Sequence, residues 1–361
     1  MATNDAELIV RCHWMLLRLA GSTPDDLLAT WRWWLGEGRV TEVGRSVSDT
    51  VPAQRLSLTR PDLDLLADLV SASAADGSVL AAAEVAEPHL MPMWAFAPTR
   101  AWTTAALRPA GGDASPVGFA PGDATPEPPN ELDLAVVDLA VVDLAVRRAT
   151  VRAVWRAWRY RSDGVPSPRR VYVLETDPDA DLSGTTLAAQ DRLAALGEPH
   201  PQVEVYPMRG EPPSYLRLAR SSGALLWSRE PDPRVRLARL FDSVDQIGPQ
   251  FAPDHPVVAA DEARRLVAYL LAGEPLLLSP VLMDDILDQT RAATVPMNFR
   301  TDGTWVWCEA CTYYLETYRL APDPELLAHV RRRRYVPAEV DGAARHRALA
   351  VLSEPLAGEP T

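Results

Sequence analysis

The stretch FRTDGTWVWCEAC, residues 299–311, carries the clearest structural signal in the chain. Asp302-Gly303 lies between β-prone residues, and an Asp-Gly pair in that setting is a strong signal for a two-residue hairpin turn. Type I′ turns need a positive φ at both central positions, which Asp and Gly tolerate better than other residues. We therefore expect a β-hairpin centred on Asp302-Gly303.

The second arm of this hairpin leads directly into Cys308 and Cys311. A tryptophan strand followed by Cys-x-x-Cys at a helix N-terminus is typical of dithiol oxidoreductases, because the helix dipole lowers a thiol pKa. Packing is the alternative, since Cys311 continues a helical stripe through Tyr314 and Tyr318. A zinc site would need further ligands, and the nearest histidines are spaced too widely. We favour packing and keep Cys308 and Cys311 as the candidate redox pair.

Around the hairpin, residues 231–361 are predicted to form an α+β C-terminal domain. Apolar spacing and capping signals predict helices over 233–241, 260–272, 280–291, 309–320, 324–334 and 342–352. The segment DDILD, 284–288, would then lie in the first turns of the third helix. Acidic residues are common there because the N-terminal end of a helix is positive.

Residues 131–230 alternate between helical and strand-like patterns. Strands are predicted over 151–160, 169–177, 203–207 and 223–227, and helices over 183–196 and 213–220 after a first helix from residue 131. This order predicts a small α/β module. The first helix contains the repeat DLAVVDLAVVDLAV, whose aspartates are about 140° apart around a helix and therefore share no single face.

The segment ETDPDAD, 175–181, follows the strongest strand pattern in the chain. Asp177-x-Asp179 is similar to the DxD motif of nucleotide-sugar glycosyltransferases, in which carboxylates hold Mg²⁺ or Mn²⁺ beneath a diphosphate. The alternative is that Asp179 and Asp181 precede a helix and complement its positive end. Asp177, Asp179 and Asp181 are the candidate metal ligands.

The first 130 residues fall into two parts that differ in amino-acid composition. Residues 1–97 are predicted to form a helical domain, and residues 98–130, rich in Pro, Gly and Ala, are predicted to be a linker. Of the three tryptophans in TWRWWLG, 30–36, helical spacing assigns two to the core. We take the remaining one, Trp33, together with Arg300 and Trp305, as the candidate partner-binding residues.

Composition excludes several classes of protein. The 361 residues carry a net charge of −13, which argues against nucleic acid or anionic membrane as the main partner. All 36 basic residues are arginine, so Schiff-base and pyridoxal chemistry and the Walker A motif are excluded. Three cysteines do not make a disulfide scaffold. Without a signal-peptide pattern or a long apolar run, we expect a cytoplasmic protein with no membrane association.

Two regions resemble known families. The element order in 131–230, ending on an aromatic strand, resembles the C-terminal part of the enhanced-serine-sensitivity protein family, which implies a small α/β fold and no particular reaction. The box FRTDGTWVW…YYL…APDPELLAH is similar to the tail of large uncharacterised actinobacterial protein families. An actinobacterial origin also fits the abundance of Ala and Pro and the absence of lysine.

We thus expect an α+β multidomain protein with a helical N-terminal domain, a small α/β module and an α+β C-terminal domain. No convergent set of titratable residues proposes a reaction. The leading hypothesis is a non-enzymatic binding, adaptor or regulatory protein without a cofactor, whose partner is another protein. The alternative is a DxD-type transferase that uses Mg²⁺ or Mn²⁺ on a nucleotide-linked substrate.

Overall fold

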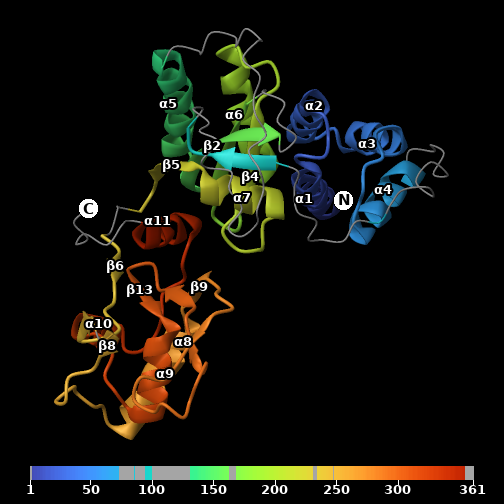
Figure 1. The fold of residues 1–361 in the computed structure, drawn as a ribbon. Helices are drawn as coiled ribbons and strands as arrows, with labels where there is room; N and C mark the ends of the chain where they lie inside the picture. Colours follow the sequence, from blue (N-terminus) through green and yellow to red (C-terminus); the bar gives the residue numbers. More distant parts are fainter. Residues whose placement is uncertain are drawn as a thin grey trace, which may run out of the picture. The chain divides into compact units, whose positions relative to one another are not determined.

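The computed structural model describes residues 2–72, 85, 94–99, 131–161, 168–230, 234–246 and 248–353. The chain has the expected α+β class (Figure 1). It forms two compact units, Met1–Glu230 and Pro231–Thr361, so the residues expected as a helical domain and as an α/β module fall within one unit. Apart from residues 98 and 99, the expected linker lies outside the described residues. None of the helices in the described part of the chain is long and apolar enough to span a membrane.

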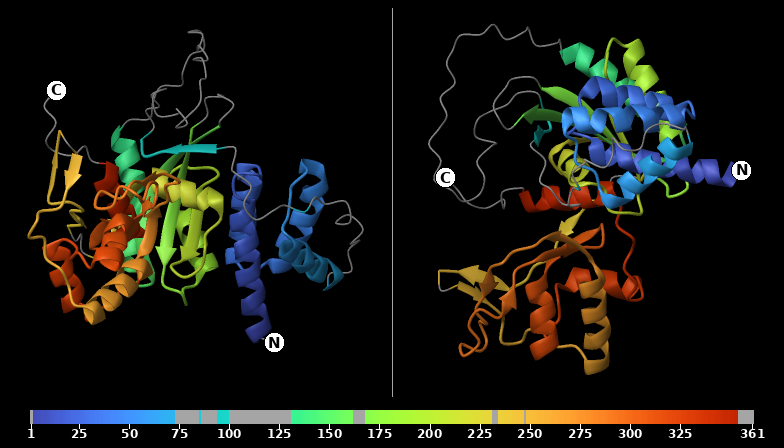
Figure 2. Two further views of the ribbon diagram at one scale, coloured as in Figure 1. Left: turned by 60° about the horizontal axis from the view of Figure 1, so that its bottom comes forward. Right: turned by 90° about the vertical axis from the view of Figure 1, so that its right-hand side faces the viewer.

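Four helices begin the first unit: α1 (Ala2–Leu19), α2 (Asp25–Gly36), α3 (Val40–Gln54) and α4 (Arg60–Ala72). Of these four helices, α3 has the weakest local signal, since it contains Pro52 and Gly44. Both residues disfavour a helix in isolation. Gly44 is needed for packing, because a Cβ there would lie 2.9 Å from the Cβ of Leu69 on α4. Figure 2 shows α3 and α4 side by side.

The sheet of the first unit has the strand order β1-β2-β3-β4, and β5 pairs with the same strand, β2, as β1 does. Its strands are β1 (Trp94–Ala97), β2 (Val151–Arg161), β3 (Arg169–Thr176), β4 (Gln202–Pro207) and β5 (Ala224–Ser228). Among the described strands of this sheet, β3 and β4 are the parallel pair, and the helix between them, α6 (Leu182–Ala195), makes the crossover that parallel pairing requires. The last helix of the unit, α7 (Ser214–Ser222), packs on β1, β2 and β3.

The main core of this unit lies between the sheet and a pair of helices, α5 (Glu131–Arg147) and α6, which lie side by side (Figures 1 and 2). Alternate residues of three strands face these helices: Val154, Tyr172, Leu174, Val203 and Val205. Strand β4 ends the sheet, yet all six of its residues are buried. Its surroundings include α1 and α2, and an edge covered in this way is protected from pairing with other chains.

The second unit is built on a four-stranded sheet of order β6-β13-β12-β9. The strands are β6 (Arg236–Leu237), β9 (Glu274–Leu277), β12 (Phe299–Thr301) and β13 (Trp305–Cys308), and the helices are α8 (Ala260–Ala272), α9 (Glu309–Tyr318), α10 (Pro324–Arg332) and α11 (Gly342–Ser353). Trp305 and Trp307 pack with α8, α9 and α10, whereas Val306 packs with α11. Two short strand pairs complete the unit: β7 (Ser243–Asp245) with β8 (Gly248–Gln250), and β10 (Leu282–Met283) with β11 (Val295–Pro296).

The predicted hairpin is confirmed, since β12 and β13 pair antiparallel. The predicted turn is wrong by one residue. The amide of Asp302 donates to the carbonyl of Trp305, so Gly303 and Thr304 are the central residues, and only Gly303 has a positive φ, of 85°. Glycine at the first central position is the signature of a type II′ turn. Asp302 is instead held by its side chain, which accepts hydrogen bonds from the amides of Thr304 and Trp305.

The helices predicted over 233–241 and 280–291 are absent. The first region contains β6, whose Arg236 and Leu237 pair in parallel with Trp305 and Val306. The second contains β10 and turns. There the acidic side chains accept backbone amides nearby: Asp284 from Ala293, Asp285 from Leu287 and Asp288 from Thr290. Such bonds compete with a helix for the same backbone groups, and this competition accounts for the difference.

Candidate functional site

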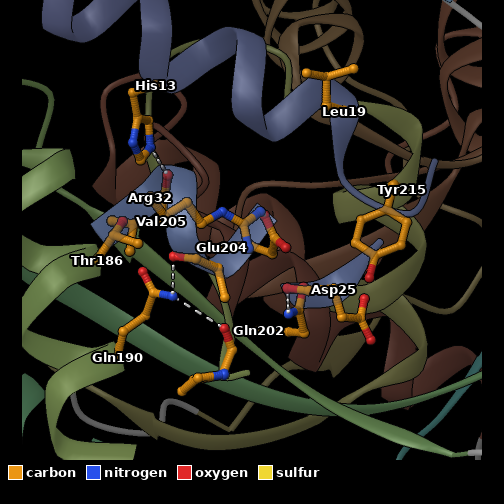
Figure 3. Close-up of polar contacts among 12 residues, drawn as sticks. His13, Leu19, Asp25, Arg32, Thr186, Gln190, Gln202, Glu204, Val205 and Tyr215 are labelled. Carbon is orange, nitrogen blue, oxygen red and sulfur yellow. Dashed lines mark hydrogen bonds and ion pairs between the residues drawn. The ribbon is translucent and has the colours of Figure 1, made fainter. Parts of the chain in front are cut away.

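A buried cluster of polar side chains joins α1 and α2 to β4 and α6 (Figure 3). We call it the β4 polar cluster, and its members are His13, Arg32, Gln190, Gln202 and Glu204. Arg32 Nη2 lies 2.5 Å from Glu204 Oε2, and the two side chains are 1% and 0% exposed. Burial raises the pKa of Glu204, and the charge of Arg32 opposes that rise. Because an isolated buried charge costs free energy, each of the two residues can stay buried and charged only while its partner is present.

The two glutamines of the cluster tie α2 to the neighbourhood of β4. The amide of Gln190 donates to the carbonyls of Ala29 and Pro201, at 3.1 and 3.3 Å. The amide of Gln202 donates to the carbonyls of Asp25 and His200, at 3.0 and 2.9 Å. Among the described residues, both glutamine Oε1 atoms, Arg32 Nη1 and Glu204 Oε1 have no hydrogen-bond partner. The cluster is therefore held by specific contacts and still has unused hydrogen-bonding capacity.

His13 completes the cluster from α1. Its Nε2 lies 2.7 Å from the carbonyl oxygen of Val205 on β4 and donates to it. Burial lowers the pKa of His13 to about 4, so the imidazole is neutral at neutral pH. The cluster therefore contains one ion pair and one neutral histidine, both closed to solvent. It can fix the helices to the sheet, but a dissolved substrate cannot reach it.

A second group of hydrogen bonds between α2 and the sheet lies beside the cluster and is centred on Arg159. Arg159 on β2 donates to both carboxylate oxygens of Asp25, at 2.8 and 2.6 Å, and to the hydroxyl of Tyr215 at 3.1 Å. Its guanidinium lies 4.3 Å from the ring centroid of Trp94. Because Asp25 is in the first turn of α2, this arginine also connects α2 to the sheet.

The three candidate metal ligands do not converge. The Asp177 carboxylate oxygens lie 3.1 Å from a nitrogen of Arg152 and 3.0 Å from a nitrogen of Arg229. Partial burial favours a higher pKa for Asp177, but the hydrogen bonds from these two arginines outweigh that effect and lower the pKa. Asp181 caps α6 by accepting from the amide of Gly184 at 2.9 Å, as the helix-capping alternative predicted. Asp179 is exposed. Over the residues described, no group of three His, Cys, Asp or Glu side chains is placed to hold a metal ion.

Both cysteines of the candidate redox pair are buried free thiols, with 7% and 8% of their surface exposed. Burial raises the pKa of Cys308, and burial together with the neighbouring Cys308 raises the pKa of Cys311 to about 12. Cys308 packs in the apolar cluster that contains Tyr314, and Cys311 packs in the neighbouring cluster that contains Trp307. At neutral pH both sulfurs are therefore protonated and shielded from reagents.

The three candidate partner-binding residues differ in exposure. Trp33 is half-buried on α2. Trp305 is only 5% exposed, with Arg236 lying 5.6 Å from its ring centroid. Arg300 pairs with the Glu309 carboxylate and donates to the backbone carbonyls of α8's last turn and the following Gly273. Arg300 and Trp305 therefore make contacts within the second unit, and Trp33 is partly exposed.

A buried cluster centred on Asp302 was not indicated by any sequence pattern. Its Oδ2 accepts from the hydroxyl of Tyr269 at 2.5 Å and lies 2.6 Å from Nε2 of His329. Burial favours a higher pKa for Asp302, but these bonds and the two turn amides lower it. Asp302 is recognisable as a turn residue, but its partners on α8 and α10 are 33 and 27 positions away. This Asp–His pair orients an imidazole that is itself 8% exposed.

A cavity of about 130 Å³ lies between α1 and α4. Trp14, Arg11 and Leu65 are among the residues that line it. Sites that enclose small molecules usually measure about 300–1,000 Å³. This cavity therefore accommodates a single side chain and is too small to enclose a nucleotide sugar.

The second unit exposes a group of aliphatic side chains where β9 leads into β10. We call it the β9–β10 surface; it consists of Leu277, Leu278, Val281, Leu282 and Leu287, which are 49%, 71%, 63%, 48% and 48% exposed. Strand β9 is also the last strand of its sheet. Single exposed aliphatic residues are ordinary, whereas five within eleven positions are an unusual concentration of exposed apolar side chains.

Comparison with known proteins finds no match: no family model, no curated protein and no solved structure resembles this chain significantly. The two family resemblances inferred from the sequence therefore stay predictions.

Proposed function

We propose that the protein is a non-enzymatic binding protein, an adaptor or regulator that acts by contacting another protein in the bacterial cytoplasm. The observation that supports the proposal most directly is the β9–β10 surface. Its five aliphatic side chains are between 48% and 71% exposed. Burying such side chains against a partner gains free energy in proportion to the apolar area removed from water, about 25 cal/mol per Å².

The charged residues beside this surface support a contact role rather than a catalytic one. Asp285, 2% exposed, accepts hydrogen bonds from the hydroxyls of Tyr313 and Tyr318, at 2.9 and 2.5 Å. Asp288 pairs with Arg291, and Asp284 accepts the amide of Ala293. These acids therefore stabilise the loop that carries Leu287.

The partner that fits is a protein with an apolar patch of its own. Interface cores are depleted in charge and enriched in large apolar side chains, whereas nucleic acid would require a basic surface. Strand β9 is the last strand of its sheet, but Pro275 has no N–H to donate and its carbonyl already accepts from Arg345 at 2.7 Å, so backbone pairing with a partner is limited. We therefore expect side-chain contacts to dominate the binding.

Quantitative affinity purification of the tagged protein from its host tests this proposal. The test variant is Leu278→Arg with Val281→Arg, and the matched control is Val244→Arg on β7, where the side chain is 74% exposed. We expect at least one stoichiometric partner with wild type and control and its loss with the double variant. A photo-crosslinking residue at position 278 should trap the same protein, and one at position 244 should not.

The proposal is wrong if the double variant retains every partner, or if wild type captures none above background. Circular dichroism and thermal unfolding of each variant ensure that a lost partner does not reflect a lost fold. Because positions 278 and 281 are exposed, we expect their substitution to change the free energy of unfolding by less than about 0.5 kcal/mol.

A further inference from the structure

A histidine side chain connects a hairpin of the second unit to the chain that follows α9. The hairpin consists of residues 242–246 and 248–255 and contains β7 and β8, and we call it the β7–β8 arm. His255 is its last residue. The Nδ1 atom of His255 lies 2.7 Å from Oδ2 of Asp242, at the start of the arm, and its Nε2 atom lies 2.9 Å from the carbonyl oxygen of Ala321. The imidazole thus bridges the two ends of the arm and a segment 66 positions further along the chain.

Both of these oxygen atoms can only accept hydrogen bonds. The amide of Ala252 and the His255 side chain lower the pKa of Asp242, so its carboxylate is ionised at neutral pH, and a carbonyl oxygen has no hydrogen to donate. A neutral imidazole has one N–H, which would satisfy one oxygen and leave a lone pair facing the other. The imidazolium form has two N–H groups and donates to both. The folded geometry is therefore complementary to protonated His255.

The other charged groups near His255 do not replace its proton. Arg239 acts on Asp242 from a distance, and its guanidinium lies 3.8 Å from Asp323, whose Oδ2 also accepts the Arg239 amide at 3.1 Å. Exposed charges are weakened by solvent and salt, so the carboxylate at 2.7 Å is the dominant charge on the imidazole. The remaining charged groups on the segments next to His255 are exposed: Asp254 and Arg319.

The bond from His255 to Ala321 lies at the end of a short backbone ladder. The amide of Ala321 donates to the carbonyl of Pro256 at 2.9 Å, and the amide of Val258 donates to the carbonyl of Arg319 at 3.0 Å. These two bonds hold the residues that follow the arm. The imidazole adds a contact made by the arm itself, so losing that contact would loosen the arm and leave the ladder intact.

Phe251 connects the arm to the core of the second unit. Its ring centroid lies 5.1 Å from that of His255 and 4.9 Å from that of Tyr314 on α9. Burial raises the pKa of Tyr314, so its hydroxyl stays neutral when His255 titrates. Because these ring contacts carry no charge, they do not depend on the proton of His255. Release of the imidazole would therefore loosen the arm without unfolding the unit.

We propose that His255 is a proton-dependent latch, which holds the β7–β8 arm against residues 319–321 when the imidazole is protonated and releases it when the proton leaves. Histidine is the side chain whose charge ordinarily changes near neutral pH. After deprotonation, the tautomer that keeps its bond to Asp242 turns the Nε2 lone pair toward the carbonyl oxygen of Ala321, and two acceptors at that distance repel each other. The latch is closed in mild acid and open in mild alkali. It acts within the second unit whether or not the β9–β10 surface binds a partner.

Nitrogen-15 NMR of the full chain, labelled at histidine, tests the bonds of the latch. At pH 5.5 we expect two slowly exchanging ring N–H signals from His255, because both protons are held in hydrogen bonds. The exposed His200 should give none. At pH 8.5 the Nε2–H signal of His255 should be lost. His255→Gln assigns the signals. A wild-type protein without a slowly exchanging Nε2–H at pH 5.5 would overturn the latch.

Hydrogen exchange with mass spectrometry measures the arm itself. We expect the protection factors of the arm to be about fivefold lower at pH 8.5 than at pH 5.5, the effect of about one net hydrogen bond. In His255→Gln, which carries no charge at either pH, the arm should have the lower protection at both. The matched control His200→Gln should behave as wild type. Circular dichroism verifies that both variants fold. Equal protection at the two pH values in wild type, or a pH dependence that persists in His255→Gln, would refute the proposal.

Discussion

Arg32 on α2 and Glu204 on β4 form an ion pair at 2.5 Å, although they are 172 positions apart in the chain and both are buried. The pair lies where the N-terminal helices meet the sheet (Figure 3). It makes the stability of the first unit depend on residues that share no local sequence pattern.

Removing one partner of this pair should destabilise the first unit strongly. Arg32→Met leaves Glu204 buried without a compensating charge, and we expect a loss of about 3–5 kcal/mol in the free energy of unfolding. Without Arg32 the pKa of Glu204 should rise further, so the loss should grow as pH rises above 4.5, the ordinary pKa of a glutamate. Urea unfolding at pH 5 and pH 8 measures both effects.

The double variant Arg32→Met, Glu204→Met is the matched control. Replacing both charges with apolar side chains is often neutral or stabilising, so its stability should lie much closer to wild type than that of either single variant. A double variant as unstable as Arg32→Met would show that the ion pair is not the source of the loss.

His13 should make the folded state sensitive to mild acid. Its folded pKa is about 4, whereas an ordinary histidine has a pKa of 6.5, so the unfolded chain takes up the proton first as pH falls. The contribution is fully present above about pH 6.5 and is lost as pH falls toward 4, by about 3 kcal/mol in total. In His13→Gln this dependence should vanish while the amide still donates. Equal pH profiles of unfolding for wild type and variant would contradict the assignment.

The hairpin shows which part of the fold was predictable from local sequence. The Asp-Gly signal gave the correct strands, because turn chemistry acts over a few residues. The turn centre differs by one residue because the Asp302 side chain accepts the amides of Thr304 and Trp305, while Tyr269 and His329 from distant helices hold the same carboxylate. The helix predicted over 280–291 failed for a local reason, since its aspartates bind nearby amides instead of completing a helix.

Asp302 should be the most sensitive position of the second unit. Asp302→Ala removes the acceptor shared by Tyr269, His329 and two turn amides, and we expect a loss of about 3 kcal/mol or more. Tyr269→Phe removes one donor to a charged group and should cost about 1.5–3 kcal/mol. Since the folded pKa of Asp302 is lowered, its contribution is present above about pH 3.8 and is lost below it. Differential scanning calorimetry of the variants at pH 7 and pH 3 measures these losses, and a wild-type transition in Asp302→Ala would refute the role.

The thiols should be unreactive in the folded protein. With Cys308 and Cys311 buried and their pKa values raised, less thiolate is present at neutral pH than for a free cysteine. Native protein should react with a colorimetric disulfide reagent at least tenfold more slowly than protein in guanidinium chloride. An insulin-reduction assay should show no activity above buffer. Rapid modification of Cys308 or Cys311 in the native protein would contradict this prediction and favour the redox hypothesis.

The candidate site was less predictable than the fold. Asp181 was recognisable as a helix cap because the cap lies three residues from the amide it accepts. The β4 polar cluster had no such signal, because Arg32, Gln190 and Glu204 meet only after α2, α6 and β4 have packed together. Buried polar contacts of this kind follow from tertiary packing, and sequence periodicity does not reveal which residues will pair.

Substitutions in the segment 175–181, and the response of the protein to Mn²⁺, distinguish a helix cap from a metal site. Asp181→Ala removes the cap of α6 and should cost about 1 kcal/mol, whereas Asp179→Ala, at an exposed position, should change stability little. Since Arg152 and Arg229 occupy the carboxylate of Asp177, Mn²⁺ with nucleotide sugars should not raise the melting temperature of wild type. Thermal-shift titration of wild type and both variants measures these effects. A clear Mn²⁺-dependent rise in the melting temperature that disappears in Asp179→Ala would instead favour the transferase. Helix capping by Asp181 would not by itself produce a response to the metal.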